Sequence, residues 1–311
     1  MRPIGVSGFS QGPLAAADQC LMRGAAQVDD ADVSVVIQGP ATRTLPEVVA
    51  SVRRYLPRAE LIVSTWDGAD VAGLDADEVI FNTDPGSVPY LDSLGQRSAK
   101  PFNTNRMLLS TRAGLLRATR PWAMKLRNDT PLRSSGCLSW FGQHNDRRIA
   151  AYRVFEQRVA MVNVAVRPGL AMPGYLFHPS DIVHLGQRTD LLRLWDSELI
   201  DEDENATWFK RRARPNPDVI PQSWCRYYNE QVLWLACLRR HGYDVGYDYA
   251  GHYSRDLVRV SEASIANNFV CAEPWQLGVS LSFGDLTRLF PIWQYGWHPA
   301  WQRMTELLCP S

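Results

Sequence analysis

Continuous apolar runs alternate with stretches of helical periodicity over residues 33–132. The run VSVVIQGP (33–40) is rich in Val and Ile without polar alternation, which is typical of a strand buried on both faces. ELIVSTW (60–66) and DEVIF (77–81) predict two more strands, and TDPGSVPY (83–90) a turn-rich loop. Between the first two strands, Thr44 and Glu47 have capping-box spacing before a helical apolar pattern.

The next segment, NTNRMLLSTRAGLLRA (103–118), has helical periodicity with Asn103 as its expected cap, and it leads directly into WAMKLRND (122–129). This alternation of strand and helix predicts a parallel, doubly wound sheet. Ligands of such sheets bind at the carboxyl ends of the strands, and Asp129 falls at such an end.

The second half of the chain is less regular. RRIAAYRVF (147–155) and VAMVNVAV (159–166) are expected to pair as strands, and residues 175–199 to form a strand, a Gly turn and a helix. A long polar loop follows from Asp201 to Pro221, a kind of segment that often serves as a lid or binding loop. Residues 227–241 predict an apolar helix ended by Gly242, and VGYDYAGHYS (245–254) a strand.

Composition fits a soluble globular protein. The chain has 311 residues, of which 45% are hydrophobic, and its 33 basic residues balance 33 acidic ones, so no nucleic-acid partner is expected. No signal peptide and no apolar run of about eighteen residues is visible. Six cysteines without metal-ligand spacing indicate free thiols in a reducing cytoplasm. We expect a cytoplasmic protein, and peripheral contact with the inner face of the membrane through loops stays open.

Lys125, Arg127 and Asp129 stand at every second position of the strand WAMKLRND, so their side chains share one face. Such groups are costly to bury alone, so they either neutralise one another or meet a charged ligand. A nucleotide diphosphate is one such ligand, because Arg, Lys, a carboxylate-bound cation or a helix N-terminus can hold it. A simple ion pair between Arg127 and Asp129 is the alternative.

The series VSVVIQGP, RRYLPRAELIVSTWDG, LDADEVIFNTDPG, NTNRMLLSTRAGL and MKLRNDTPL resembles the WavE-type lipopolysaccharide-synthesis family, whose members resemble glycosyltransferases of the GT-A fold. The resemblance continues in FHPSDIVHLG and NEQVLWL. It implies an α/β, GT-A-like fold: a Rossmann-type, mostly parallel sheet with helices on both faces and a mixed C-terminal part. The implied activity moves a sugar from a nucleotide-sugar donor to a bacterial surface glycan, lipopolysaccharide or capsule.

The polar residues 1–31 are expected to be a poorly ordered leader. For the rest of the chain the resemblance implies a nucleotide-sugar-binding half, residues 32–142, and an acceptor-binding half of the same compact domain, residues 143–311. The two expected substrates are therefore a nucleotide-sugar donor and a glycan acceptor.

Where GT-A enzymes usually carry Asp-x-Asp for Mn²⁺ or Mg²⁺, this chain has Arg127-Asn128-Asp129. Asp129 is the expected metal ligand, with His252 as a second ligand near the C-terminus. A divalent-cation requirement stays open, because Arg127 could contact phosphate directly. By position, the resemblance assigns further residues to the donor: Gln38, Asp67, Asn103, Asn105, Arg106 and Lys125.

Glu230, at the start of the helix around NEQVLWL, is the expected catalytic base, and a first-turn Glu favoured by the helix dipole is the alternative. Asp181 is the rival base, unless it is a buried Asp paired to His178 or His184. Trp208 and Trp224 flank the long loop and are the expected acceptor contacts.

Two other functions stay open. One is a sugar nucleotidyltransferase, for which QGPATRT (38–44) is a poor version of the required Gly-rich loop. The other is a non-catalytic carbohydrate-binding protein, because Arg127 replaces a metal-binding carboxylate.

Overall fold

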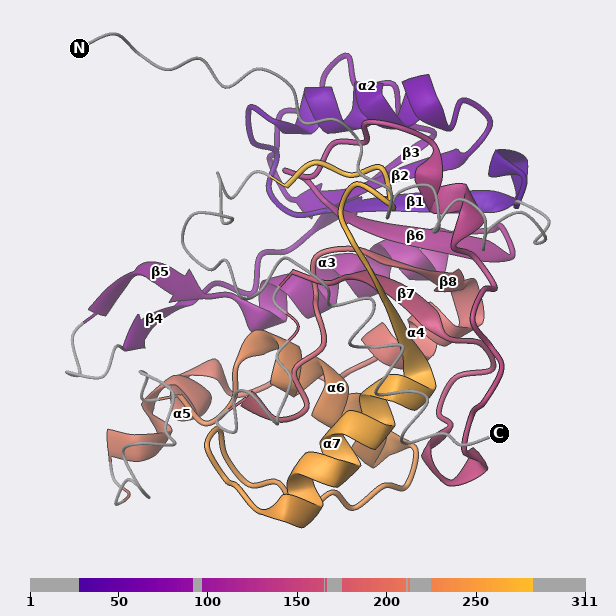
Figure 1. The fold of residues 1–311 in the computed structure, drawn as a ribbon. Coiled ribbons are helices and arrows are strands. Elements are labelled where there is room, and N and C mark those ends of the chain that lie inside the picture. Colours follow the sequence, from indigo (N-terminus) through magenta and orange to yellow (C-terminus); the bar gives the residue numbers. More distant parts are fainter. Residues whose placement is uncertain are drawn as a thin grey trace, which may run out of the picture.

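The computed structural model describes residues 28–91, 97–164, 166, 175–210, 212 and 225–281 (Figure 1). Most of the expected leader and Trp224 lie outside these ranges. One seven-stranded sheet runs through both halves of the described chain, in the order β3-β2-β1-β6-β8-β7-β9. Its strands are β1 (Val33–Gln38), β2 (Glu60–Trp66), β3 (Glu78–Asn82), β6 (Trp122–Arg127), β7 (Val159–Val162), β8 (His184–Gln187) and β9 (Phe269–Ala272).

The sheet is mostly parallel. β1, β2, β3 and β6 pair in parallel, and β7 pairs in parallel with β9, while β8 runs antiparallel to both β6 and β7. A separate antiparallel hairpin joins β4 (Val88–Leu91) to β5 (Arg97–Phe102). The predicted parallel sheet with a mixed C-terminal part is confirmed.

Helices cover both faces of the sheet. The helices are α2 (Leu45–Tyr55), α3 (Thr104–Arg117), α4 (Arg188–Trp195), α5 (Glu202–Thr207), α6 (Asn229–Arg240) and α7 (Arg255–Asn268). The connection through α2 steps from β1 outward to β2, whereas the connection through α3 returns from β3 to β6. Because parallel crossovers are right-handed, these opposite steps place α2 and α3 on opposite faces. Figure 1 shows α4 and α6 beyond α3, which contacts both.

The packing of α3 on the sheet depends on Gly114. A Cβ atom at Gly114 would overlap Cγ1 of Val36 and lie 3.5 Å from Cβ of Ser64. One turn earlier, the hydroxyl of Ser110 donates to Oε1 of Gln38 at 2.9 Å. Glycine therefore lets α3 approach β1 and β2 closely, and the helix start is held at the carboxyl ends of these strands.

Four elements differ from the predictions. The predicted loop from Asp201 to Pro221 contains α5 over Glu202–Thr207. RRIAAYRVF contains only a 3-10 turn, Ala150–Tyr152, because the side-chain Oδ1 of Asn268 accepts the amides of Val154 and Phe155 that a strand partner would have bound. VGYDYAGHYS is not a strand, and Gly246 and Gly251 interrupt it with positive φ angles of 58° and 95°. The end of TDPGSVPY forms β4 instead of continuing as a loop.

Three local predictions were also wrong in detail. Asn103 is at the N-cap of α3, but its side chain makes no cap hydrogen bond. Thr44 is at the N-cap of α2 but makes no side-chain cap, because its hydroxyl donates to the carbonyl of Asn128 at 3.0 Å. Gly186 lies inside β8 and not in a turn, and a Cβ there would lie 3.2 Å from Cγ2 of Val159 on the neighbouring strand. Neither α7 nor β9 was predicted from the sequence, and both are present.

Late residues of the described chain return to the end of β6. Leu132 forms an antiparallel bridge with Val279, the amide of Arg133 donates to the carbonyl of Gly278 at 2.6 Å, and the amide of Ser280 donates to that of Pro131 at 2.9 Å. The segment that follows Asp129 thus takes its backbone partners from the far end of the chain.

Candidate functional site

The carboxyl ends of β1 and β6 meet at one edge of the sheet, where Gln38 is in register with Arg127. Asn128 fixes the loop after β1: its Nδ2 donates to the carbonyl of Pro40 at 2.5 Å and contacts the hydroxyl of Thr42 at 3.0 Å. Gly39 has a φ of 124°, and a Cβ there would lie 2.8 Å from Oδ1 of Asn128, so glycine is required for this close approach.

Arg127 and Asp129 form a two-pronged ion pair at the end of β6. Nε of Arg127 lies 3.0 Å from Oδ1 of Asp129, and Nη2 lies 2.7 Å from Oδ2. The two side chains are 28% and 22% exposed, so solvent reaches the pair. The predicted alternative, an ion pair within the mixed-sign row, is therefore present, and the planar fork of Arg127 has the shape that also binds phosphate.

Lys125 was expected to contact a donor diphosphate, but its side chain is directed into the protein interior. Its side chain is fully buried, Nζ lies 4.9 Å from the ring centroid of Trp195, and it donates to the carbonyls of Asp181 and, at 3.4 Å, Ile182. Lys125 thus anchors the segment that leads into β8.

Burial lowers the pKa of Lys125 to about 7. Among the charges that act on it, Asp181 opposes this shift, Arg127 adds to it, and Asp129 and Glu230 oppose it. The charges of Arg127 and Asp129 on the same strand end, and of Asp181 and Glu230 from later in the sequence, therefore all act on this ammonium group.

Glu230 lies in the first turn of α6, with its side chain 18% exposed. Its Oε2 is 3.4 Å from Nε2 of His178, which is almost fully buried. The alternative to a catalytic role for Asp181 was a buried ion pair with His178 or His184. His178 instead lies against Glu230, and His184 contacts the carbonyl of Ser180 at 2.7 Å and Nε1 of Trp195 at 3.2 Å.

The starts of α3 and α6 are tied together. The hydroxyl of Thr104 donates to Oδ1 of Asn229 at 2.6 Å, and Nδ2 of Asn229 donates to Oδ1 of Asn103 at 3.2 Å. Because Asn229 immediately precedes Glu230, these two bonds fix the candidate base relative to the helix that follows the donor edge.

The side chain of Asn105 is hydrogen-bonded to the backbone of another segment of the protein. Its Nδ2 donates to the carbonyl of Ile200 and its Oδ1 accepts the Ile200 amide, both at 2.9 Å. Its own amide donates to Glu202 at 2.7 Å, and burial raises the pKa of that carboxyl group. Asn105 therefore holds the segment before α5, a contact that the prediction of donor binding did not include.

Arg106 and Asp67 lie nearer solvent. Nε of Arg106 lies 2.6 Å from Oδ1 of Asp84, and this hydrogen bond lowers the pKa of Asp84. Asp67 follows β2, is exposed, and accepts the Thr83 hydroxyl at 2.9 Å. Both side chains are at the carboxyl-end edge of the sheet, as the sequence predicted, and their substrate contacts stay predictions.

His252, the second expected metal ligand, lies among aromatic rings. None of its described contacts is with Asp129. Its ring stacks on Tyr247 and Tyr249 with centroid separations of 6.1 and 5.3 Å, and Nδ1 is 3.9 Å from Asp248. In the described ranges, no three His, Cys, Asp or Glu side chains gather in a way that could hold a metal ion. With Arg127 bound to its carboxylate, Asp129 offers a donor set that does not fit a divalent cation.

Trp208 carries a guanidinium on each face of its indole. Cζ of Arg212 and Cζ of Arg226 lie 3.4 and 4.0 Å from the ring centroid, too close for both to fit on one side. Stacking on a sugar ring, the expected role of Trp208, would require one of them to move. Trp208 also lines a pocket of about 220 Å³ between α5 and α6, whose walls include Ile200, Val232 and Leu235.

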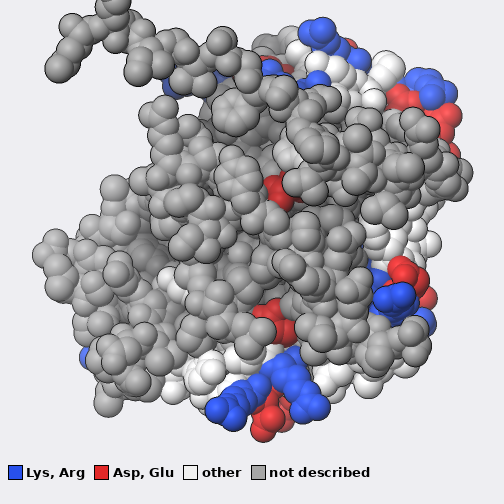
Figure 2. Space-filling model, in the orientation of Figure 1, with Lys and Arg blue, Asp and Glu red and all other residues white. Residues whose placement is uncertain are grey.

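Figure 2 shows that described basic and acidic side chains lie side by side on the face in view, without a broad patch of one sign among them. This agrees with the equal numbers of basic and acidic residues. None of the helices in the described ranges is long and apolar enough to cross a membrane.

Sequence reasoning missed His178 as a partner of Glu230, and Thr104 and Asn229 as the link between two helices. The sequence does show a polar residue at the start of α3 and of α6, but such residues do not indicate that the two helix starts are in contact. Asn128 was visible only as the middle residue of Arg127-Asn128-Asp129.

The fold and site together define an α/β protein with a charged cluster at the carboxyl ends of a mostly parallel sheet. The family described as WavE lipopolysaccharide synthesis matches residues 33–289. The chain therefore belongs to this lipopolysaccharide-synthesis family.

Two solved structures are similar at a distance. One is the galactosyltransferase LgtC in complex with donor and acceptor sugar analogues, at 12% identity and a TM-score of 0.36. The other is an active-site mutant of LgtC, at 12% identity and a TM-score of 0.38. Each match covers 89% of this chain and 97% of the other. No curated protein matches this chain.

Proposed function

We propose that the protein is a glycosyltransferase that moves a sugar from a nucleotide-sugar donor to a bacterial surface glycan, lipopolysaccharide or capsule. Family membership supports work in lipopolysaccharide synthesis. The observation that carries the proposal is the two-pronged Arg127–Asp129 ion pair at the carboxyl end of β6, because a guanidinium held there can bind a donor phosphate. We further propose that the enzyme works in the cytoplasm, at or near the inner face of the membrane.

The donor is proposed to bind along the carboxyl-end edge. Arg127 and Arg106 each hold a carboxylate through a two-pronged contact, and a diphosphate oxygen can use the same geometry. Asp67 is proposed to meet the ribose hydroxyls. Gln38 and Asn103 complete this edge, while Lys125 and Asn105 support it from within.

In the proposed reaction, an acceptor hydroxyl oxygen attacks the anomeric carbon of the donor sugar. The new carbon–oxygen bond forms as the bond to the phosphate oxygen breaks, and its electron pair leaves with the nucleoside diphosphate. The hydroxyl proton passes to the carboxylate of Glu230, and Arg127 balances the charge that grows on the diphosphate. Asp181 is the alternative base, because its charge acts on the same Lys125.

The experiment measures nucleotide release from a panel of nucleotide sugars, with Mn²⁺, with Mg²⁺ and with a chelator. Glu230→Gln should lower turnover by about 10²- to 10⁴-fold while leaving donor affinity nearly unchanged. Asp129→Ala should weaken donor binding, because it frees Arg127 from its fixed orientation. Glu198→Gln, an exposed carboxylate, is the matched control. Unchanged turnover in Glu230→Gln would remove Glu230 as the base and leave Asp181.

The Arg127–Asp129 ion pair favours one other candidate, a non-catalytic carbohydrate-binding protein, because the pair satisfies both charges without substrate. Thermal stabilisation by a glycan, with none by any nucleotide and no nucleotide release, would favour it. Pyrophosphate release from a nucleoside triphosphate and a sugar phosphate would instead indicate a sugar nucleotidyltransferase.

A further inference from the structure

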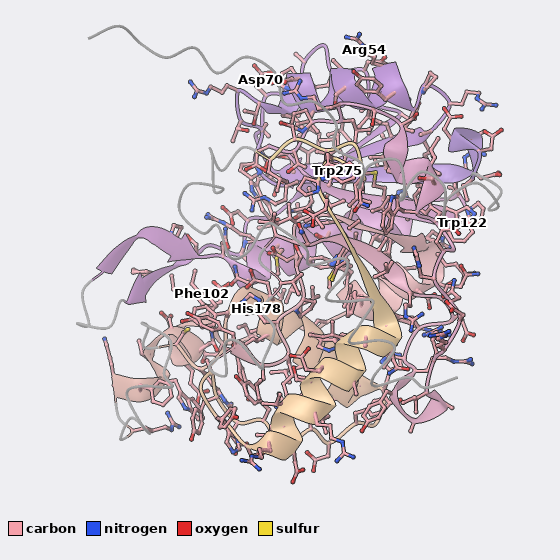
Figure 3. The ribbon with its side chains drawn as sticks, viewed as in Figure 1. Arg54, Asp70, Phe102, Trp122, His178 and Trp275 are labelled. Carbon is pink, nitrogen blue, oxygen red and sulfur yellow. The ribbon has the colours of Figure 1, made fainter. Side chains whose placement is uncertain are left out.

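His178, labelled in Figure 3, forms a pair with Glu230 at the start of α6. Nε2 of the imidazole is 3.4 Å from Oε2 of the carboxylate. The His178 side chain is 2% exposed and that of Glu230 is 18% exposed, so the contact is shielded on the histidine side and open to solvent on the carboxylate side. Partial burial strengthens such a contact relative to one on the surface.

The surroundings of His178 hold the ring in place. The rings of Tyr175 and Tyr228 lie 5.8 and 6.0 Å from it, centroid to centroid, at interplanar angles of 76° and 52°. Tyr228 immediately precedes α6, and its amide donates to Oε1 of Gln231 at 3.1 Å, so this wall is fixed to the same helix start as Glu230.

The chain that carries His178 is anchored as well. Lys125 donates to the carbonyls of Asp181 and Ile182, and His184 binds the carbonyl of Ser180. These buried contacts fix residues 180–184 against β6 and β8 only a few positions after His178. The backbone a few positions after His178 is therefore anchored, and the ring itself contacts Glu230 of α6.

We propose that His178 is a positioning residue for Glu230: it holds one carboxylate oxygen, fixes the orientation of the group, and favours its charged form for proton transfer. This inference rests on the proposed function of Glu230 as the base. The charge of Lys125 acts on the Glu230 side of the pair, and Lys125 is itself under the charges of Asp181, Arg127 and Asp129. The rings of Tyr175 and Tyr228 lie beside the His178 imidazole.

The first test needs no turnover. Histidine carbon resonances of the ¹³C-labelled full chain are followed through a pH titration in the wild type, in Glu230→Gln and in His178→Gln, which assigns the His178 signal among six histidines. A nearby carboxylate favours the imidazolium, so Glu230→Gln should move the His178 titration midpoint to lower pH. His241, an exposed residue after the other end of α6, is the internal control and should not move. An unchanged His178 midpoint in a folded variant would overturn the proposal.

The second test uses nucleotide release. His178→Gln and the ring-filling variant His178→Phe should lower kcat by about 10- to 100-fold with little change in the donor KM, because the base is misplaced and not removed. The acid limb of the pH–rate profile should shift in both. Combined with Glu230→Gln, His178→Phe should cause no further loss.

The outcomes separate the two proposals. A wild-type chain without transfer or hydrolysis of any donor would refute the proposed function, whereas the titration would still decide whether His178 is coupled to Glu230. An active wild type with a damaged Glu230→Gln variant and an unaltered His178→Phe variant would refute the positioning role alone. His241→Gln should match the wild type in every assay.

Discussion

Lys125 should make the stability of the protein depend on pH in an unusual direction. Its ordinary pKa of 10.5 falls to about 7 in the folded state because the ammonium is buried. Between these values the unfolded chain keeps a proton that the folded chain has released, so the free energy of unfolding rises with pH. Below about pH 7 both states are protonated, and the full cost of the buried charge is present.

The size of the effect follows from the shift. One proton difference changes the unfolding free energy by about 1.4 kcal/mol per pH unit. Since some folded molecules still carry the proton near pH 7.5, the expected gain between pH 7.5 and 8.5 is about 1 kcal/mol. Lys125→Met should abolish this gain, although it also leaves the carbonyls of Asp181 and Ile182 without their donor and so lowers stability at high pH.

The assay is urea unfolding of the wild type, Lys125→Met and Lys210→Met at pH 7.5 and 8.5, followed by tryptophan fluorescence. Lys210 is exposed, so its variant should keep the wild-type slope. Buried thiols begin to act in the opposite direction near the top of this range, but they do so equally in all three proteins, so the difference between the variants isolates Lys125. If the wild type and Lys125→Met gain the same stability over this interval, the buried ammonium is not the cause, and the reasoning fails.

Two further predictions concern packing and thiol chemistry. Gly114→Ala should lower the unfolding free energy by about 1–2 kcal/mol, because overlap with Val36 outweighs the helix-propensity gain, and the same substitution in a Val36→Ala background should cost less in urea unfolding. Greater stability of Gly114→Ala alone would refute the close approach of α3. Burial raises the pKa of the thiols of Cys137 and Cys237 to about 12, so iodoacetamide at pH 8 should alkylate them only after denaturation, as read by peptide mass spectrometry. Alkylation of either thiol in the folded chain at the rate of a free cysteine would contradict this.

The first half of the fold could be predicted because its strands are buried on both faces. All six residues of β1 are buried, so the sequence from Val33 to Gln38 has an apolar run that no surface element would show. The second half depends on contacts that leave little local pattern. Asn268, which replaces a strand partner for Val154 and Phe155, lies more than a hundred positions further along the chain.

The candidate site divides in the same way. The spacing of Arg127 and Asp129 was enough to predict a shared face and a possible ion pair, and the structure contains that pair. The burial of Lys125 depends on Trp195 and on the segment before β8, which the strand sequence alone does not contain. The contact of Glu230 with His178 requires the packing of α6, which periodicity does not specify.

The bridge between Leu132 and Val279 bears on the order in which the protein can fold as it is synthesised. The backbone after Asp129 is hydrogen-bonded to residues near Gly278. The first strands of a nascent chain therefore lack these partners until residues 278–280 have been synthesised and released from the ribosome. Closing so long a loop is a late and slow event. Shortening the chain before Gly278 would therefore disturb the neighbourhood of Asp129 more than its position near the end of the sequence suggests.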